Sequence, residues 1–300
     1  MPEKVFGPNH VFLQKEEILT FEEIILVAEA FACCGGKKIR LTGGEPLLRP
    51  NLPELVRSLR AIGGIKEIAL TTNGLLLPKH AAELKAAGLD RVTLSLDSLD
   101  EKTFRRMSGR DVPVQKALEG IRCAEEAGLT IKVNAVIIRH QNEDQVLQLA
   151  EHFRGTAHVL RFIEFMDVGN CNQWTPEKVY TGREILRDLQ AHHEFEPIEA
   201  NHAGEVANRY RYCDGLGEFG IIASVSQPFC GNCNRARLSA DGKLFTCLFA
   251  TSGVSLRDLI RKGGDIIGFL HNHWGKRSDR YSELRGTRAT KKVEMSYLGG

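Results

Sequence analysis

Residues 20–45, TFEEIILVAEAFACCGGKKIRLTGGE, contain the pattern that decides the fold. Apolar residues recur at helical spacing up to Cys34, and KKIRLTGGE at 37–45 is a short β-type run. The same unit recurs four more times before residue 166. Because alternating α and β units of this length build parallel sheets, we expect an α/β fold whose sheet is open or rolled into a barrel. The further helical segments are 50–62, 79–88, 113–128 and 142–153, and the further β-type runs are 67–74, 91–97, 131–137 and 160–165.

The β-type runs are apolar on one face only. In the first run Ile39 and Leu41 share one face, and Arg40 and Thr42 share the other. A strand buried on both faces would be almost entirely apolar, and a polar barrel interior is costly unless water or a ligand satisfies it. We therefore expect a ligand cavity at the carboxyl ends of the strands, although a solvated sheet face would give the same pattern. The polar face continues through Thr71 and Asn73, Thr93, Ser95 and Asp97, Lys132 and Asn134, and Glu164 and Met166.

The composition narrows the class of protein. The 300 residues include 40 basic and 38 acidic side chains, a net charge of +2, which is too small for a nucleic-acid or membrane-surface footprint. The sequence shows neither a signal peptide nor a membrane span, so we expect a cytoplasmic protein whose cysteines are free or metal-bound. Five of the eight cysteines lack ligand spacing, and we expect these five to be small buried hydrophobes: Cys33, Cys34, Cys123, Cys171 and Cys213.

The chain changes character after residue 170. Residues 181–196 and 254–290 are expected to be helical, and EFGIIASVS at 218–226 is expected to be a strand. GLGEFG at 215–220 fits G-x-G-x-x-G, but it leads into that strand instead of opening a helix. We therefore interpret it as a turn and not as a dinucleotide site.

A cysteine cluster follows this strand. Cys230, Cys233 and Cys247 have metal-ligand spacing, C-x2-C followed by thirteen residues and a third cysteine. Structural zinc would need a fourth ligand, such as Cys213 or a distant histidine. A [4Fe-4S] cluster with one open iron needs only the three, and the nearby Arg235 and Arg237 could then bind phosphate or base acceptors beside that iron.

The order and spacing of these motifs resemble a known family. IRLTGGEPLLRP, LTTNG, LSLDSLD, KVNAVI, RFIEFMDVG, CGNCNRARLSADGKLFTCLF and the final YLGG are similar to the GTP 3',8-cyclases of molybdenum-cofactor biosynthesis, which are radical S-adenosylmethionine (SAM) enzymes. The resemblance implies an incomplete (β/α)6 TIM-like barrel over 1–169. A C-terminal α+β extension over 170–300 would then carry an iron–sulfur cluster and a diglycine tail. It also implies cyclisation of GTP to 3',8-cyclo-7,8-dihydro-GTP, an electron donor and a homodimer.

The resemblance assigns roles to individual residues. Cys230, Cys233 and Cys247 would ligate a [4Fe-4S] cluster, and Gly299-Gly300 would be the tail that reaches into the site. The SAM contacts would be Gly44, Ser95 and Met166. The GTP contacts would be Arg40, Thr71, Lys132, Arg235 and Arg237.

The chain departs from the family in one motif. The family binds a second [4Fe-4S] cluster through C-x3-C-x2-C, and no such motif occurs in the 300 residues. Because MPE matches the residues that follow that motif, we expect the first barrel strand, an upstream arginine and three cysteines to precede Met1. We expect this chain to be inactive in SAM cleavage, since Cys33 and Cys34 are adjacent and point apart on a helix. The alternatives are a GTP- and cluster-binding remnant without catalysis, another radical SAM maturase, and a structural zinc protein.

Overall fold

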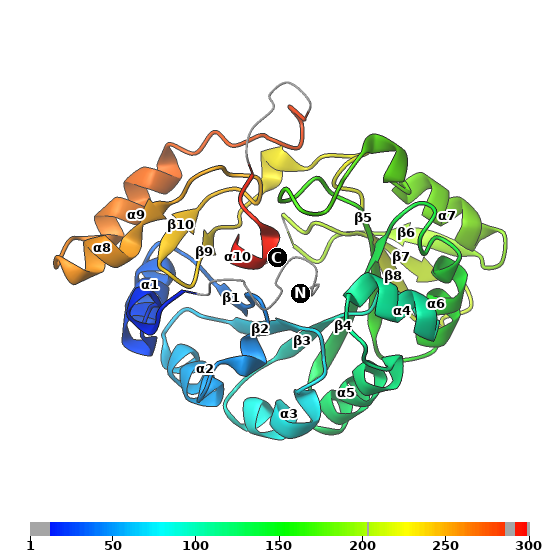
Figure 1. Ribbon diagram of the computed structural model, residues 1–300, viewed down its shortest axis with the longest axis horizontal. Helices are drawn as coiled ribbons and strands as arrows, with labels where there is room; N and C mark the ends of the chain where they lie inside the picture. The colour runs from blue at the N-terminus through cyan, green and yellow to red at the C-terminus, as the bar shows by residue number, and fades with distance from the viewer. Residues whose placement is uncertain (1–12, 203, 286–291, 299–300) are drawn as a thin grey trace.

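One curved sheet with helices on its outer side forms the body of the molecule (Figure 1). The computed structural model describes residues 13–202, 204–285 and 292–298. Within these ranges the sheet has eight strands in the order β1-β2-β3-β4-β5-β8-β7-β6. The first six in this order are parallel neighbours, while β7 and β6 are antiparallel. The strands are β1 (Lys38–Leu41), β2 (Glu67–Thr72), β3 (Arg91–Ser95), β4 (Thr130–Ile137), β5 (Val159–Glu164), β6 (Phe195–Ile198), β7 (Asn208–Tyr212) and β8 (Glu218–Ile222).

The outer face of the sheet is buried by helices whose ends are marked in the sequence. Thr20 and Glu23 cap α1 reciprocally, with Glu23 N–H donating to Thr20 Oγ1 at 3.2 Å and Thr20 N–H donating to Glu23 Oε2 at 2.9 Å. Alternate strand residues such as Ile68, Val133 and Phe162 are fully buried against this layer. The helices are α1 (Phe21–Cys33), α2 (Leu52–Ala61), α3 (Leu77–Ala86), α4 (Glu101–Ser108), α5 (Val114–Glu126), α6 (Gln145–Phe153) and α7 (Gly182–Gln190), and short 3-10 turns are η1 (Lys15–Glu17), η2 (Pro46–Leu48), η3 (Pro176–Lys178) and η4 (Cys230–Asn232).

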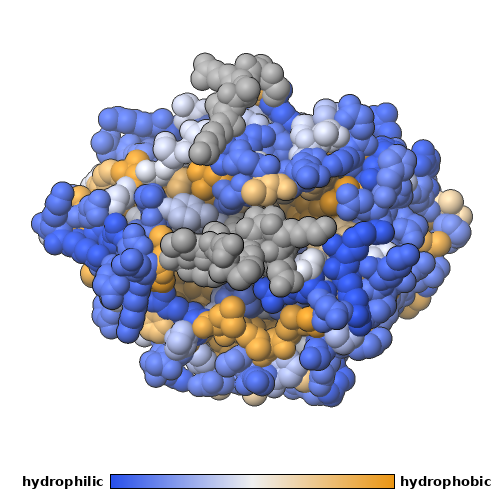
Figure 2. Space-filling view, in the orientation of Figure 1, coloured by the Kyte–Doolittle hydropathy of each residue, from blue (hydrophilic) through white to orange (hydrophobic). Residues whose placement is uncertain are grey.

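The C-terminal part adds a small antiparallel sheet of β9, β10 and β11 and three helices. In Figure 1 this part lies beside α1, and α10 lies over the open centre of the curved sheet. In the same orientation, most of the surface around the edge of the molecule is hydrophilic (Figure 2). The elements are β9 (Arg237–Leu238), β10 (Lys243–Phe245), β11 (Val254–Ser255), α8 (Leu256–Arg261), α9 (Ile266–Gly275) and α10 (Met295–Leu298).

The expected α/β fold, a partial barrel with a C-terminal extension, is confirmed. All five β-type runs before residue 166 are parallel strands, and the strand expected at 218–226 pairs in parallel with β5 as β8. The helix expected at 181–196 ends earlier, at Gln190, and the chain then enters β6. None of the described helices is both long and apolar enough to cross a bilayer.

Candidate functional site

The inner face of the curved sheet, opposite the helices, is strongly cationic. Glu67 makes ion pairs there with Lys38 at 2.8 Å and with Arg91 at 2.6 Å. Although burial opposes it, these two cations lower the pKa of Glu67 to about 2. Glu205 is the other carboxylate that interacts with this group of cations in the described ranges. Positive charge therefore exceeds negative charge, and the cations that interact with one another are Lys38, Arg40, Arg91, Lys132, Arg161, Arg235 and Arg237.

Burial and mutual repulsion lower the pKa values of several of these cations, including that of Arg237 to about 10. Burial, followed by repulsion from Arg161 and Arg91, lowers the pKa of Lys132 to about 8. Burial and the charges of Arg91 and Arg235 lower the pKa of Arg40 to about 10, and burial and Arg40 lower that of Arg161 to about 9. The side chain of Arg40 is nevertheless partly open to water. Since guanidinium groups stay protonated at neutral pH, this face needs an anionic ligand to offset its charge.

Buried polar atoms without partners lie on the same face. Among the described residues, Thr71 Oγ1, Asn134 Oδ1 and Arg161 Nε are buried and make no hydrogen bond. Strand register brings them near one another, because Asn134 lies opposite Arg161, and Thr71 and Lys132 both lie opposite Thr93. Buried polar atoms are normally paired, so these atoms indicate the position of a bound ligand.

The proposed SAM contacts occupy the carboxyl ends of three strands. Gly43 and Gly44 follow β1, and Gly43 has a φ of 135° with nothing within 4 Å of the position that a Cβ would take. Such a loop lets a ligand approach the backbone closely. Ser95 ends β3 with an exposed side chain, and Met166 follows β5 and packs against the small cluster around Ile163.

The three cysteines lie beside the inner face, in three different surroundings. Arg235 donates from Nε and Nη2 to Cys233 Sγ at 3.3 and 3.2 Å. Although burial opposes it, Arg235 and Arg277 lower the pKa of the Cys233 thiol to about 7. Burial raises the pKa of the Cys247 thiol, although the Phe249 N–H donates to its sulfur at 3.4 Å.

By donor type, the three cysteines fit an iron–sulfur cluster, while a structural zinc ion would need a fourth ligand. In the described part of the chain, no three Cys, His, Asp or Glu side chains converge closely enough to hold one ion. Structural zinc requires four ligands at about 2.0–2.3 Å from the same ion. Cys213 lies at the opposite end of β8 from Cys230, and five strand residues span roughly 16 Å. In a [4Fe-4S] cluster each thiolate binds a different iron, so the donor set fits that group.

One sequence expectation about the site was wrong, one remains open, and one residue was missed. Glu164 does not join the inner face. It is fully buried and accepts hydrogen bonds from Gly182 N–H at 2.7 Å and from the N–H groups of Val225 and Ser226 at 2.8 Å. Arg161 is the inward polar residue of β5, and the sequence analysis missed it. The diglycine tail at 299–300 lies outside the described residues.

The expectation that five cysteines are buried was wrong. Cys33 and Cys34 are exposed at the end of α1, Cys171 and Cys213 are exposed in loops, and Cys123 is half-buried on α5. Exposure of a cysteine costs little free energy because its side chain has a small apolar surface.

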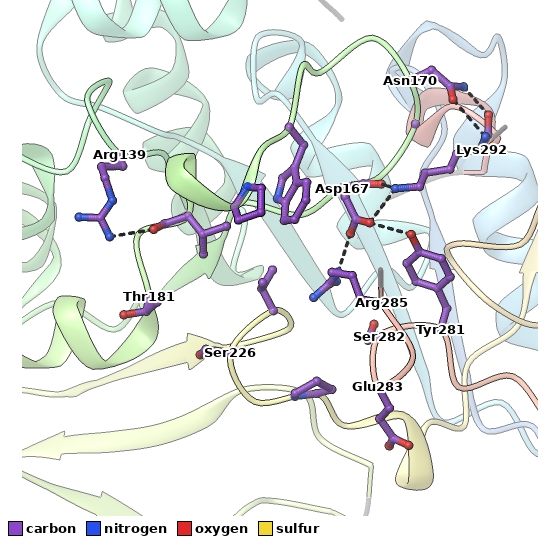
Figure 3. Close-up of a pocket in the computed structure, with 16 residues that line it drawn as sticks. Arg139, Asp167, Asn170, Thr181, Ser226, Tyr281, Ser282, Glu283, Arg285 and Lys292 are labelled. Atoms are coloured by element: carbon purple, nitrogen blue, oxygen red, sulfur yellow. Dashed lines mark hydrogen bonds and ion pairs between the residues drawn. The ribbon is translucent and has the colours of Figure 1, made fainter. Parts of the chain in front are cut away.

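A pocket of about 1230 Å³ is lined by residues from the loops that follow β4, β5 and β8 and from the C-terminal segment (Figure 3). Its wall contains none of the predicted site residues, so we do not assign the chemistry to it. At its centre Asp167 accepts from Arg285 Nε at 2.8 Å, from Lys292 Nζ at 2.6 Å and from Tyr281 Oη at 2.7 Å. These contacts connect Tyr281, Arg285 and Lys292 to the loop that follows β5.

Two family models match the chain. Residues 7–153 match the Radical SAM superfamily, and residues 158–283 match Molybdenum Cofactor Synthesis C. The chain is 50% identical over 297 residues to a GTP 3',8-cyclase of Xanthomonas campestris pv. campestris, covering 98% of this chain and 88% of the relative. It is 47% identical over 331 residues to a GTP 3',8-cyclase of Acidothermus cellulolyticus, covering 100% and 91%.

Solved structures agree with the fold. The structure of Streptococcus suis SuiB bound to S-adenosylmethionine has a TM-score of 0.63 at 15% identity, covering 94% of this chain and 64% of that one. Native anSMEcpe with bound AdoMet has a TM-score of 0.56 at 14% identity, covering 98% and 89%. At these identities the likeness concerns the fold alone, but the sequence relatives are much closer. The chain belongs to the GTP 3',8-cyclase family, within the radical SAM superfamily.

Proposed function

We propose that this chain binds GTP on the inner face of its sheet and acts as a GTP 3',8-cyclase of molybdenum-cofactor biosynthesis. The observation that carries the proposal is the excess of cations on that face, together with the buried, unpartnered atoms of Thr71, Asn134 and Arg161. A triphosphate supplies the negative charge that the cations lack and acceptor oxygens for Thr71 Oγ1 and Arg161 Nε, while Asn134 Oδ1 would accept from a donor group of the nucleotide. The proposed GTP contacts are Arg40, Thr71, Lys132, Arg161, Arg235 and Arg237.

The cofactors are proposed from the family and from the donors present. Cys230, Cys233 and Cys247 would hold a [4Fe-4S] cluster, and Gly44, Ser95 and Met166 would contact SAM. When bound to an iron–sulfur cluster, SAM supplies the radical that removes a ribose hydrogen from the nucleotide. An electron donor and a homodimer are further proposals that rest on the family.

The protein's own residues perform the positioning. Lys132 and Arg161, on neighbouring strands, would hold the phosphates at one end of the nucleotide. Arg237 lies between the cysteines and Arg40 and interacts with the charges of both, so it can contact the nucleotide near the cluster. A substrate fixed at both ends presents its ribose in one orientation, and such positioning can supply much of the rate enhancement.

Calorimetric titration of the anaerobically reconstituted chain tests the proposal. We expect GTP to bind much more tightly than guanosine, because the triphosphate meets most of the cations. Arg161→Gln should weaken GTP binding by about 10–100-fold, the value of a charged hydrogen bond, and leave guanosine unaffected. Arg122→Gln, on the exposed outer helix α5, should bind GTP like the unmodified chain. Equal affinity for GTP and guanosine would refute the assignment.

One sequence feature favours a second candidate function, GTP and cluster binding without radical chemistry. The 300 residues lack the C-x3-C-x2-C motif through which the family binds its SAM-cleaving cluster. We therefore propose that these residues alone form no 5'-deoxyadenosine from SAM under reducing, anaerobic conditions. Formation of 5'-deoxyadenosine by the reconstituted chain would contradict this and favour the active enzyme.

A further inference from the structure

The two arginines that follow the C-x2-C motif have different surroundings. Arg235 donates two hydrogen bonds, from Nε and Nη2, to the sulfur of Cys233 at 3.3 and 3.2 Å. Arg237 lies two residues further on, at the start of β9, and its guanidinium makes no hydrogen bond within the described ranges. Arg235 therefore already donates to a sulfur atom, while Arg237 has donors that are available to a ligand.

The surroundings hold Arg235 in this position. Its guanidinium lies over the ring of Phe229, 5.3 Å from the ring centroid. On the other side of the cysteine, Arg277 donates to the carbonyl oxygen of Cys233, and its guanidinium lies 4.8 Å from the centroid of Trp274. Arg277 also makes an ion pair with Asp279 at 3.3 Å. Two cations therefore lie beside Cys233, and Arg235 is the one that donates to the sulfur at 3.3 and 3.2 Å.

The three candidate ligands are consequently not equivalent. The sulfur of Cys247 receives one backbone N–H, from Phe249 at 3.4 Å, and no arginine donates to it. The sulfur of Cys230 receives no hydrogen bond from the described residues. In a cluster held by these cysteines, the thiolate of Cys233 would be the one that accepts hydrogen bonds from an arginine of the described residues.

We propose that Arg235 is a positioning residue that raises the reduction potential of the cluster by hydrogen bonding to Cys233. Reduction adds an electron to the cluster, and N–H donors and positive charge near the sulfurs favour that added negative charge. The inference rests on the proposed [4Fe-4S] cluster.

A redox titration monitored by electron paramagnetic resonance tests the inference. The chain and its variants are reconstituted anaerobically, iron and sulfide are counted, and the midpoint potential of the cluster is measured without nucleotide. Arg235→Gln should shift the midpoint to a more negative value, and Arg235→Lys, which keeps the charge but loses the fork of donors, should give a smaller shift in the same direction. Arg237→Gln is the comparison for charge alone, because its guanidinium interacts with the charges of Cys233 and Cys247 but donates no hydrogen bond to their sulfurs within the described ranges, and its shift should be clearly smaller than that of Arg235→Gln.

A second measurement keeps the test decisive if Arg235→Gln assembles poorly. The chain is labelled with ¹⁵N-arginine, and electron spin echo modulation is recorded on the reduced cluster. A ¹⁵N coupling should be present in the unmodified chain, persist in Arg237→Lys and become clearly weaker in Arg235→Lys, where Arg277 is the arginine left beside Cys233.

The outcomes separate this inference from the proposed function. A chain that takes up no iron and sulfide would overturn the cluster assignment and this inference with it. A loaded cluster whose midpoint and ¹⁵N coupling are unchanged by the Arg235 variants would overturn only the role of Arg235. Equal shifts in the Arg235 and Arg237 variants would also contradict it, since the effect would then be one of general charge.

Discussion

Arg285 and Asp167 form an ion pair that is almost closed to water, with Nε 2.8 Å from Oδ1 and side chains that are 13% and 6% exposed. The guanidinium of Arg285 also lies over the rings of Trp174 and Phe249. Because Met166 immediately precedes Asp167, this pair connects the C-terminal segment to a proposed SAM contact.

Removing the charge of Asp167 should weaken the whole fold. Asp167→Asn leaves Arg285 and Lys292 without a counter-charge, and we expect the free energy of unfolding to fall by about 3–5 kcal/mol. Glu283→Gln is the control, because its ion pair with Arg280 at 2.5 Å is largely exposed and should be worth about 0–1 kcal/mol. Urea denaturation measures both variants, and equal losses would contradict the prediction.

The pH dependence of that loss has a defined sign. Although burial opposes it, Lys292 and Tyr281 hold the pKa of the Asp167 carboxyl below its usual range. The stabilisation is therefore complete above the unfolded pKa of about 3.9 and is lost as the pH falls through the lower folded value. The difference between Asp167→Asn and the unmodified chain should be constant from about pH 5 to 7 and shrink below about pH 4.

Gly169 permits the close approach of Glu294. Its φ is 74°, and an added Cβ would collide with the Glu294 carboxylate, whose Oε1 accepts the Asn170 N–H at 2.8 Å. Gly215 has a similar φ of 79° with open space around it, so Gly215→Ala isolates the backbone cost of about 1–2 kcal/mol. Gly169→Ala should lose more stability than this control in thermal denaturation. Equal melting temperatures for the two variants would count against the steric argument.

Nucleotide binding should take up a proton through Lys132. Burial and the neighbouring arginines lower the pKa of its ammonium from 10.5 to about 8, and a bound triphosphate would raise it again. Between these two values the free chain has lost a proton that the complex holds. Calorimetry of GTP binding at pH 8, where Arg161 with its pKa of about 9 is still mostly protonated, should show proton uptake in buffers of different ionisation enthalpy, and Lys132→Gln should remove most of it. An uptake that persists in the variant would assign the proton to another group.

The same shift predicts how the free chain responds to pH. The unfolded chain binds more protons at Lys132 than the folded chain does between pH 8 and 10.5, so this group makes the folded chain more stable as pH rises through that range. Lys132→Gln should remove that contribution to the slope. A difference curve of unfolding free energy between the two chains, measured against pH, checks the sign.

Glu164 should matter for cluster assembly without touching the cluster. Its carboxylate holds the backbone of Val225 and Ser226, five residues or fewer before Cys230. In Glu164→Gln an amide N–H₂ would face these donors, so we expect a loss of about 2–4 kcal/mol in unfolding free energy and fewer irons per chain after reconstitution. Glu218→Gln, at the other end of β8, breaks an ion pair with Arg209 and should leave the iron content unchanged.

Much of the barrel could be predicted because polar and apolar residues alternate along its strands and the strands alternate regularly with helices along the chain. The alternation of polar and apolar residues in β1 to β4 correctly identified the faces of Arg40, Thr71 and Lys132. Prediction failed on β5, where the polar residue near the strand end, Glu164, satisfies the backbone of α7 and of the loop after β8. An arginine inside the apolar run LRFIEF was the available signal for Arg161, because a charged residue in a parallel strand needs a partner.

The surroundings of the cysteines could not be predicted from spacing. Spacing identified Cys230, Cys233 and Cys247 as a group, but it contains nothing about which sulfur meets Arg235. That contact depends on the turn at η4, on Phe229 directly before it, and on Arg277, which is distant in the sequence. Burial of the remaining cysteines was misjudged because residue type alone was used, without the helix end or loop that holds each one.

The place of β8 in the sheet makes the two halves of the sequence interdependent. This strand comes from the region after residue 170, yet it pairs with β5 and leads directly into the cysteine segment. In a fragment that ends at residue 169, the backbone of β5 would be an unpaired sheet edge that can aggregate. In the remaining fragment, β8 would lack the strand with which it pairs. If the two fragments are produced in one cell, each should need the other in order to fold, because β5 and β8 pair only when both are present.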